Sequence, residues 1–512
     1  MTVQEPRLWS PAAPHLYVLC TGGVVDREET RIGIRDLQIT KEHGFVINGK
    51  PLRLVGSNRH MEYPYVGNAL PENAQYRDVY QIRTNGFNVV RLGHYPQASA
   101  VLAACDELGL LVIEPIPGWQ FFNGDPVFVE QTYQDVRDLI RRDRNHASVV
   151  MRETTLNESW PPAEWKDGAV RVAHEEYPGD QCFTSGDAYG YDGFDICYND
   201  WQEGFRRPNQ TEKPGFIREY YDYEFGGHYS TSRVSRGDGE RALLQNAWNA
   251  QWPHNRYRLL YPSTIGDAVW SMYDYNRGCC DNICYSGVAD VFRLPKYSLH
   301  FFRTQVAPGT AGPDGAKAPE VFIASGWEQR PQGADTLVVY GNVEEVELFV
   351  NGKLLKRQGK DEGADSDYVP SFDGGNCRQL NFPPFTFTGV VWEAGEVKAV
   401  GYIGGKKVAE MAVRTPGQPA RLVIGYFESG RPAGRQDLLI VNVHAEDQDG
   451  TPVLRNGIRI GLQVEGGTVV GPEYYDTEAG IASFLVATGK DKKLKITAWG
   501  EKLRSQRTIP LL

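Results

Sequence analysis

The chain has 512 residues and a formal net charge of −11 at pH 7. Single hydrophobic cores stop growing at about 250 to 300 residues, so we expect several domains. No basic run offsets the acidic balance, which excludes nucleic acid and anionic membrane surfaces as partners and favours a neutral or weakly polar substrate. No stretch is long and apolar enough to span a membrane.

Two features of the composition bear on function. Twelve per cent of the residues are aromatic, including 11 Trp and 27 Tyr; aromatic rings stack on sugars, but they also fill barrel and sandwich cores. The 8 cysteines are scattered, so no disulfide framework is implied. Cys279, Cys280 and Cys284 form the only cluster. Without ligand-spaced histidines nearby, we expect thiols there and no zinc site.

Residues 1–40 resemble the end of a β domain. Residues 16–19 and 31–39 alternate as half-buried strands do, and two or three strands cannot form a sandwich. The first six residues lack the basic and apolar regions of a secretory signal. If the natural N-terminus lies further upstream, a periplasmic or secreted location stays open.

Residues 41–305 alternate between strand-like and helix-like stretches, the pattern of a parallel (β/α)8 TIM barrel. A helix is predicted over 98–108. The fourth strand is predicted to end at Glu158 and the seventh at Glu219. The other strands are expected near 52–56, 87–91, 109–114, 181–184, 194–197 and 267–271.

Short alternating strands with turn signals follow the barrel and predict two β-sandwiches, at 318–415 and 419–512. The clearest strands are 337–340, 346–350 and 397–400 in the first sandwich, and 438–443 and 494–499 in the second. Asn351-Gly352 predicts a tight hairpin turn, and 416–419 a linker. The fold class is therefore a multidomain chain with a barrel flanked by sandwiches.

Glu158 and Glu219 are the first catalytic candidates. Barrel enzymes place their chemistry at the C-terminal ends of their strands, and strands four and seven lie on opposite sides of the barrel mouth. Two carboxylates in that arrangement can straddle a sugar and hydrolyse its glycosidic bond.

Several barrel motifs resemble glycoside hydrolase family 2, which includes β-galactosidases, β-glucuronidases and β-mannosidases. They run in the family's order through the first 305 residues. The matching stretches are Ile47–Pro51, Gly56–His60, Asn88–Pro96, Cys105–Leu110, Asp143–His146, Asn157–Glu158 and Ala268–Ser271. The resemblance implies that the flanking β units are immunoglobulin-like, and that residues 1–40 are the C-terminal remnant of one. A jelly-roll sugar-binding domain precedes it in the family and is absent from this chain.

By resemblance, Glu158 is the acid/base and Glu219 the nucleophile of a retaining mechanism. We expect the charge of Glu219 to raise the pKa of Glu158 and so keep it protonated. Asn157 would bind the sugar 2-hydroxyl. The remaining substrate-binding candidates are Arg91, His94, His60, Trp270, Tyr198 and Trp201.

The chain departs from the family pattern at two places. Where many members read Trp-Ser-Leu-Gly before Asn-Glu, Arg152–Leu156 stands here and is one residue longer. Pro115 replaces the carboxylate that binds magnesium in some β-galactosidases. We therefore expect no metal and no other cofactor.

We interpret the chain as a retaining exo-β-glycosidase, first of all a β-galactosidase, acting on an oligosaccharide or a polysaccharide-derived substrate. A β-glucuronidase is the alternative, and it needs a cation for the uronate, for which the candidates are Arg59, Arg206, Arg207 and Arg277. The alternative of another class is an inert sugar-binding or structural fragment, because the upstream domain is missing.

Overall fold

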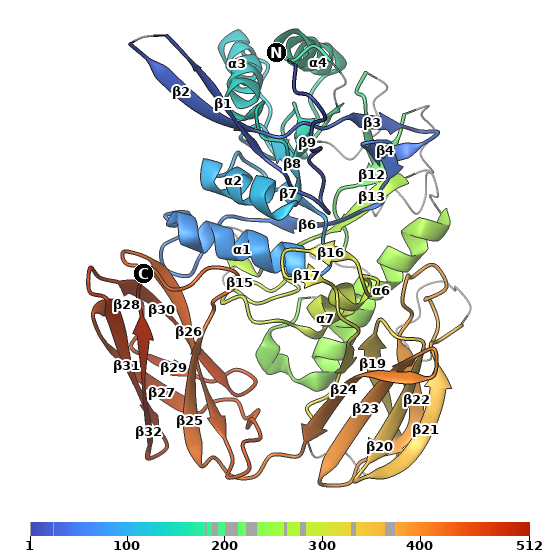
Figure 1. Ribbon diagram of the computed structural model, residues 1–512, viewed down its shortest axis with the longest axis vertical. Helices are drawn as coiled ribbons and strands as arrows, with labels where there is room; N and C mark the ends of the chain where they lie inside the picture. The colour runs from blue at the N-terminus through green and yellow to red at the C-terminus, as the bar shows by residue number, and fades with distance from the viewer. Residues whose placement is uncertain are drawn as a thin grey trace.

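The chain folds into a helix-flanked barrel with two β-sandwiches beneath it, as the computed structural model shows (Figure 1). The structure describes residues 2–23, 25–179, 182–186, 193–199, 213–221, 233–260, 264–276, 283–328, 334–363 and 374–512. Within these ranges, no helix is both long and apolar enough to cross a membrane.

Eight parallel strands form the barrel, which confirms the predicted fold class. Their order is β10-β9-β8-β7-β6-β13-β12-β11, and a parallel bridge from Thr184 to Ile196 brings the two edges together. The strands are β6 (Leu54–Arg59), β7 (Val89–Leu92), β8 (Leu111–Pro115), β9 (Val149–Glu153), β10 (Phe183–Thr184), β11 (Cys197–Asn199), β12 (Gly215–Ile217) and β13 (Thr264–Val269).

Helices cover the outside of the barrel and begin and end at recognisable signals. Asp125 caps one of them by accepting a 2.8 Å hydrogen bond from the backbone N–H of Val127, with Pro126 in the first turn. Gly109 ends another in the left-handed conformation at φ 69°. The helices are α1 (Glu72–Thr84), α2 (Ser99–Leu108), α3 (Pro126–Asp143), α4 (Ala163–Glu176), α6 (Glu240–Leu260), α7 (Tyr297–Thr304) and the short 3-10 helix Arg236–Asp238.

Two strand ends were predicted wrongly. β9 ends at Glu153 and β12 at Ile217, so both candidate glutamates lie in the loops that follow. Next to β9, strand β8 ends at Pro115, which is paired with Glu153. The last bond between these strands runs from the N–H of Ile116 to the carbonyl of Glu153, at 3.1 Å.

The N-terminal segment forms β1 (Tyr17–Gly22), β2 (Arg27–Ile32), β3 (Leu37–Thr40), β4 (Gly44–Ile47) and β5 (Lys50–Pro51). The β1–β2 hairpin projects from the barrel (Figure 1). The single strand predicted over 31–39 is divided between β2 and β3. Between them Gly33 packs against Trp9 and Ala147, and Arg35 donates to the carbonyl of Val149 at 2.6 Å. These contacts hold the chain against the barrel.

Both predicted sandwiches consist of two facing antiparallel sheets. Asn351 and Gly352, at φ 48° and 77°, form the predicted hairpin turn. The first sandwich contains β18 (Val321–Ile323), β19 (Ala334–Gly341) and β22 (Phe385–Val391), facing β20 (Glu345–Val350), β21 (Lys353–Gly359), β23 (Glu396–Ile403) and β24 (Lys406–Arg414). The second contains β25 (Arg421–Tyr426), β26 (Leu438–Glu446), β28 (Gly467–Val470) and β30 (Ile481–Thr488), facing β27 (Arg459–Glu465), β29 (Tyr474–Asp476), β31 (Lys493–Gly500) and β32 (Leu503–Pro510).

Two short hairpins lie outside the barrel and the sandwiches, namely β14 (Tyr275–Asn276) with β15 (Ile283–Cys284), and β16 (Ala311–Gly312) with β17 (Gly315–Ala316).

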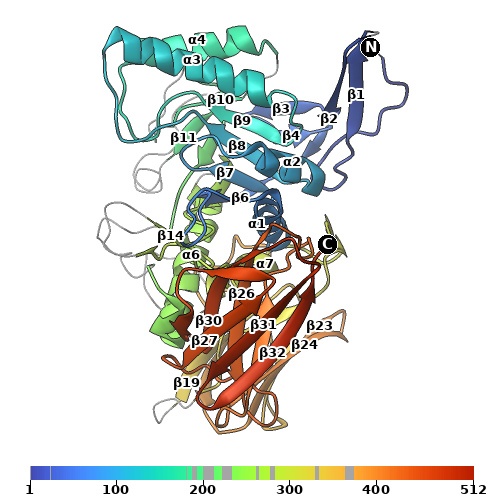
Figure 2. The ribbon, with the colours of Figure 1, turned by 90° about the vertical axis from the view of Figure 1, so that its left-hand side faces the viewer.

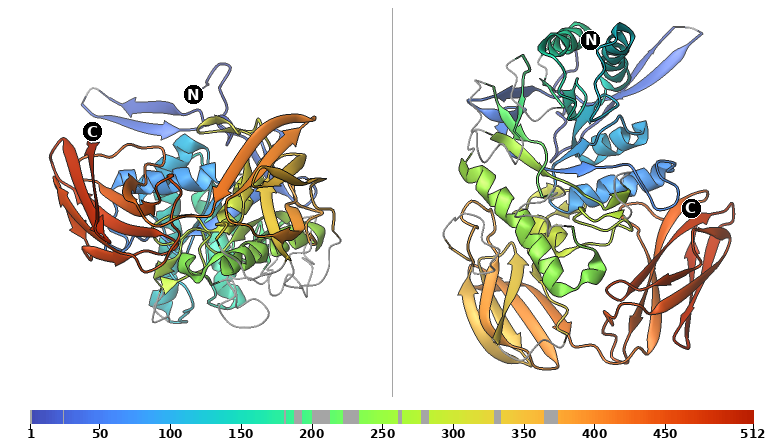
Figure 3. Two further views of the ribbon diagram at one scale, coloured as in Figure 1. Left: turned by 90° about the horizontal axis from the view of Figure 1, so that it is seen from below. Right: turned by 180° about the vertical axis from the view of Figure 1, so that it is seen from behind.

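The second sandwich lies beside α1 of the barrel (Figure 2), and the two sandwiches lie next to each other below the barrel (Figure 3). A buried ion pair between Arg77 of α1 and Asp437 of the second sandwich, at 2.6 Å, joins the two domains. Because both side chains are buried and paired, the contact fixes the second sandwich to the barrel.

Candidate active site

Glu158 and Glu219 meet at the C-terminal end of the barrel. Glu158 lies in the loop after β9, with its backbone in the left-handed region at φ 51°, and Glu219 lies just after β12. The guanidinium of Arg218 donates to both carboxylates, at 3.2 Å to Glu158 and 2.9 Å to Glu219. The two glutamates are therefore separated by one guanidinium group, which is the scale on which paired-carboxylate hydrolysis operates.

Arg91, near the end of β7, links the polar residues of the site through hydrogen bonds. It donates to Glu219 at 2.5 Å, to the side-chain oxygen of Asn157 at 2.9 Å and to that of Asn58 at 3.0 Å. The strongest partner of Arg91 is Glu153, which accepts from two of its nitrogens, one of them at 3.0 Å. Arg91 is fully buried, so these contacts are little screened by water. They fix the position of the Glu219 carboxylate.

Glu153 is a site residue that sequence reasoning missed. It ends β9, is fully buried, and accepts a 2.7 Å hydrogen bond from the hydroxyl of Tyr198 as well as those from Arg91. Tyr198 was predicted to follow strand six, but it lies within β11 and is 1% exposed. Its hydroxyl is thus directed at Glu153, beneath the carboxylates of Glu158 and Glu219.

The charge state of Glu158 differs from the expectation. Burial raises the pKa of its carboxyl, but the Arg218 guanidinium and the Gln120 amide, which donates at 3.0 Å, outweigh burial and hold the pKa below its usual value. The sequence predicted the opposite direction from the charge of Glu219. Arg218 is the reason, because it stands between the two carboxylates and offsets their repulsion.

Aromatic rings form one wall of the site. His94 stacks on Trp270 with ring centroids 4.8 Å apart, and its Nε2 lies 4.0 Å from Glu219. His60 stacks on Tyr275 at 4.3 Å, and Tyr275 accepts a 3.0 Å hydrogen bond from the Trp270 indole. Burial and the nearby Arg91 lower the pKa of both histidines, that of His60 to about 3. Both imidazoles are therefore neutral at physiological pH.

The structure thus brings together eight of the nine predicted site residues. Trp201, Arg206, Arg207, Arg277, Cys279 and Cys280 lie outside the described residues. Arg59, a candidate for binding a uronate, is fully buried in an ion pair with Asp78 at 2.6 Å. Across the described ranges, no group of three or more His, Cys, Asp or Glu is placed to hold a metal ion.

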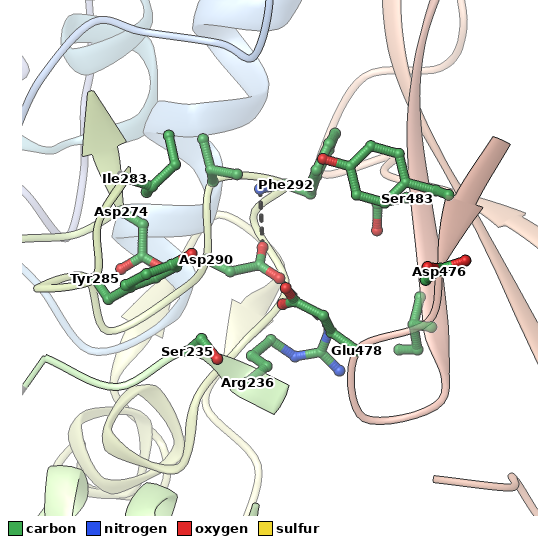
Figure 4. Close-up of a pocket in the computed structure, with 13 residues that line it drawn as sticks. Ser235, Arg236, Asp274, Ile283, Tyr285, Asp290, Phe292, Asp476, Glu478 and Ser483 are labelled. Carbon is green, nitrogen blue, oxygen red and sulfur yellow. Dashed lines mark hydrogen bonds and ion pairs between the residues drawn. The ribbon is translucent and has the colours of Figure 1, made fainter. Parts of the chain in front are cut away.

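A cavity lies between the barrel and the second sandwich (Figure 4). Asp290 accepts a 2.9 Å hydrogen bond from the backbone of Phe292 and pairs with Arg236 at 3.5 Å, while Glu478 faces them from the sandwich. Burial raises the pKa of both carboxyls. None of the predicted site residues lines this cavity, which lies at the contact between the two domains.

Comparison with known proteins assigns the family. The profile "Glycosyl hydrolases family 2, TIM barrel domain" matches residues 37–173, the profile "Glycosyl hydrolases family 2" matches residues 1–35, and a domain of unknown function matches 333–409. A β-galactosidase of Thermoanaerobacter pseudethanolicus is 32% identical over 99% of this chain and 68% of its own length. The chain belongs to glycoside hydrolase family 2. It is a glycoside hydrolase.

Solved structures share the fold of this family 2 hydrolase. A β-glycosidase from Bacteroides vulgatus superposes with a TM-score of 0.80 at 20% identity, over 99% of this chain and 71% of that one. A family 2 β-glucuronidase superposes with a TM-score of 0.79 at 22% identity, over 100% of this chain and 54% of that one. At these identities the likeness concerns the fold alone.

Proposed function

We propose that this chain is a retaining exo-β-glycosidase that releases terminal β-linked sugars, with Glu219 as nucleophile and Glu158 as acid/base. The observation that carries the proposal is the Arg218 guanidinium, which binds one oxygen of each carboxylate. Retaining enzymes need two carboxylates about 5 to 5.5 Å apart, one to attack the anomeric carbon and one to protonate the departing oxygen. We take residues 41–305 as the catalytic unit.

Glu219 has the surroundings of a nucleophile. Arg91 and Arg218 each donate to the same oxygen, Oε1, at 2.5 and 2.9 Å, which favours the ionised carboxylate and fixes its orientation. The side chain retains 18% of its exposure, so a substrate can reach it. Nδ1 of neutral His94 accepts from Arg91 at 3.4 Å, so its Nε2–H, 4.0 Å from Glu219, can donate a hydrogen bond to the bound sugar without adding charge.

Glu158 is the more exposed carboxylate, at 31%, and stands at the mouth of the site. A general acid must carry a proton when the glycosidic bond breaks. Substrate entering between the carboxylates separates Glu158 from Arg218, which removes the largest contribution that lowers its pKa. Glu158 can then take up a proton, and after the covalent intermediate forms it acts as base toward water.

Asn157 is held for contact with the sugar. Its side-chain oxygen accepts from Arg91 at 2.9 Å and also from Arg218, which leaves its amide group to donate. A hydrogen bond from that amide to the 2-hydroxyl oxygen would strengthen as positive charge develops at the anomeric carbon. Trp270 stacks on His94, whose Nδ1 lies 3.4 Å from the guanidinium of Arg91.

We propose β-galactosides as the first substrate class. The relative at 32% identity is a β-galactosidase. In the described part of the site the two cations, Arg91 and Arg218, are already paired with the glutamates, and aromatic groups lie beside them. A β-glucuronidase needs a cation for the uronate, and Arg59 is committed to Asp78. An inert sugar-binding fragment remains the alternative of another class, and only it predicts binding without turnover.

The test is an assay of the 512-residue chain on para-nitrophenyl β-galactoside, β-glucuronide and β-mannoside. We expect release from the galactoside, and loss of it in Glu219→Gln, whose side chain keeps its size but cannot attack. Glu478→Gln, in the cavity between the barrel and the second sandwich, is the matched control and should retain activity. Turnover by Glu219→Gln at the rate of the parent would refute the assignment, and loss in Glu478→Gln would move the site to that cavity.

A further inference from the structure

Three large aromatic side chains lie exposed beside Glu158. Trp119 is 49% exposed, Phe121 61% and Trp160 57%. We propose that these rings, here called the aromatic platform, bind the leaving-group part of a β-linked oligosaccharide of at least two further sugar units. The inference rests on the proposed role of Glu158 and extends it to the substrate class.

The backbone places the platform at the acid/base. Trp119 forms an isolated β-bridge with Asn157, and the N–H of Gln120 donates to the carbonyl of Asn157 at 2.8 Å. The side chain of Gln120 then donates to Glu158 at 3.0 Å. The loop with Trp119 and Phe121 therefore runs along the loop with Glu158 and Trp160.

The rings are supported from below while remaining open to solvent. Trp119 lies against His94 and Tyr95, with ring centroids 6.3 and 6.4 Å apart, and Phe121 packs edge-on against Phe128 at 5.7 Å. The next residue, Phe122, is directed into the core cluster between α3 and α4 instead. Exposed aromatic rings held in place by the fold indicate a binding surface.

Trp160 adds an independent indication. Its backbone is in the left-handed region at φ 50°, as is that of Glu158 at φ 51°. A bulky residue in this conformation is uncommon and strained. In this strained conformation the large ring of Trp160 lies at the surface, two positions after the proposed acid/base. Burial would stabilise a Trp side chain more, so its exposure here indicates a role in binding.

The chemistry of the reaction identifies the occupant. Glu158 protonates the oxygen that departs, so whatever is attached to that oxygen lies on the Glu158 side, while the attacked sugar lies toward Glu219. A pyranose ring presents C–H groups on its faces and hydroxyls at its edge, which suits stacking on an aromatic ring with the edge in water. Rings spread over two loops suit consecutive sugars of a chain.

The experiment compares two substrates that differ only in the leaving group. β-Galactosyl fluoride has no ring to stack, and the β-galactosyl tri- or tetrasaccharide that the enzyme hydrolyses fastest fills the platform. Phe121→Leu and Trp160→Leu remove the aromatic face and keep an apolar side chain. For each, the ratio of kcat/KM for the oligosaccharide to kcat/KM for the fluoride should fall roughly three- to tenfold. Trp160→Phe should restore most of the ratio.

Tyr474→Leu is the matched control, since Tyr474 is 46% exposed and packs edge-on against Trp499 in the second sandwich. It should leave the ratio unchanged. An unchanged ratio in Phe121→Leu and Trp160→Leu would overturn the platform. If the parent chain hydrolyses neither substrate, the proposed function fails, and calorimetry of oligosaccharide binding decides the platform separately: affinity lowered by Phe121→Leu and Trp160→Leu supports it, and unchanged affinity overturns it.

Discussion

Substitution of Glu153 by Gln tests how the barrel interior positions the two proposed catalytic carboxylates, Glu158 and Glu219. Glu153 is fully buried, and its carboxylate accepts from Arg91 and, at 2.7 Å, from Tyr198. Gln has the same shape but no charge. Both oxygens of Glu153 accept hydrogen bonds, so the NH2 group of Gln would face a donor from Arg91 or Tyr198 that it cannot satisfy. Arg91 therefore loses its main counter-charge while its 2.5 Å contact with Glu219 remains.

The expected magnitude follows from these contacts. Removal of one partner from a buried ion pair costs about 3 to 5 kcal/mol, and Glu153→Gln should lie near 3 because one acceptor oxygen stays. Arg91 is then drawn toward Glu219, its remaining carboxylate, and shifts relative to Asn157. A displacement of about 1 Å at the reacting groups lowers kcat by roughly 100-fold.

Urea unfolding and steady-state kinetics measure the two effects, with Asp437→Asn as the matched control. Asp437 is also a buried carboxylate paired with an arginine, at 2.6 Å, but it joins α1 to the second sandwich. Both variants should lose stability by a similar amount, and only Glu153→Gln should lose activity. If the folded Glu153→Gln protein turns over at the rate of Asp437→Asn, Glu153 does not position Arg91 for catalysis.

Three further predictions concern Glu158 and its loop. Glu158→Ala should lower kcat/KM more than 100-fold for an alkyl β-galactoside and far less for a dinitrophenyl one, whose leaving group departs without a proton; equal losses would contradict its role as acid. Gln120→Met removes a hydrogen bond that lowers the pKa of Glu158. The pKa of Glu158 then rises, so the protonated acid persists to higher pH. The alkaline limb of the profile of kcat/KM against pH should therefore move to higher pH, and a move to lower pH would contradict the role of Gln120 in lowering that pKa. Gly186→Ala places a Cβ 2.7 Å from the backbone nitrogen of Asn157, so activity should fall while the far-ultraviolet circular dichroism stays unchanged.

Much of the fold was predictable because the patterns are local. The hydrophobic runs of β6, β7 and β8 and the Asn351-Gly352 turn appear at their predicted places. Strand ends were less predictable, because they depend on the neighbouring strand. β9 ends at Glu153, level with the end of β8 at Pro115, and β8 comes from another part of the sequence.

In the candidate site, too, local patterns were predictable and contacts between distant segments were not. Glu158 and Glu219 were found from strand order and family motifs, whereas Glu153 and Gln120 were not, because their partners come from other strands and loops. The pKa of Glu158 was predicted in the wrong direction, since nothing in the sequence places Arg218 between the carboxylates. The departure at Arg152–Leu156 was the available signal for Glu153, as it marked an altered rim of β9.

In the proposed mechanism, Glu219 forms a covalent bond with the sugar. The most direct measurement is mass spectrometry of the protein after reaction with 2-deoxy-2-fluoro-β-galactosyl fluoride, whose electron-poor ring slows hydrolysis of a glycosyl-enzyme. We expect one added fluorosugar, on the peptide that contains Glu219, and none in Glu219→Gln. Label on Glu158, or hydrolysis of β-galactosyl fluoride with inversion at the anomeric carbon and no adduct, would contradict it.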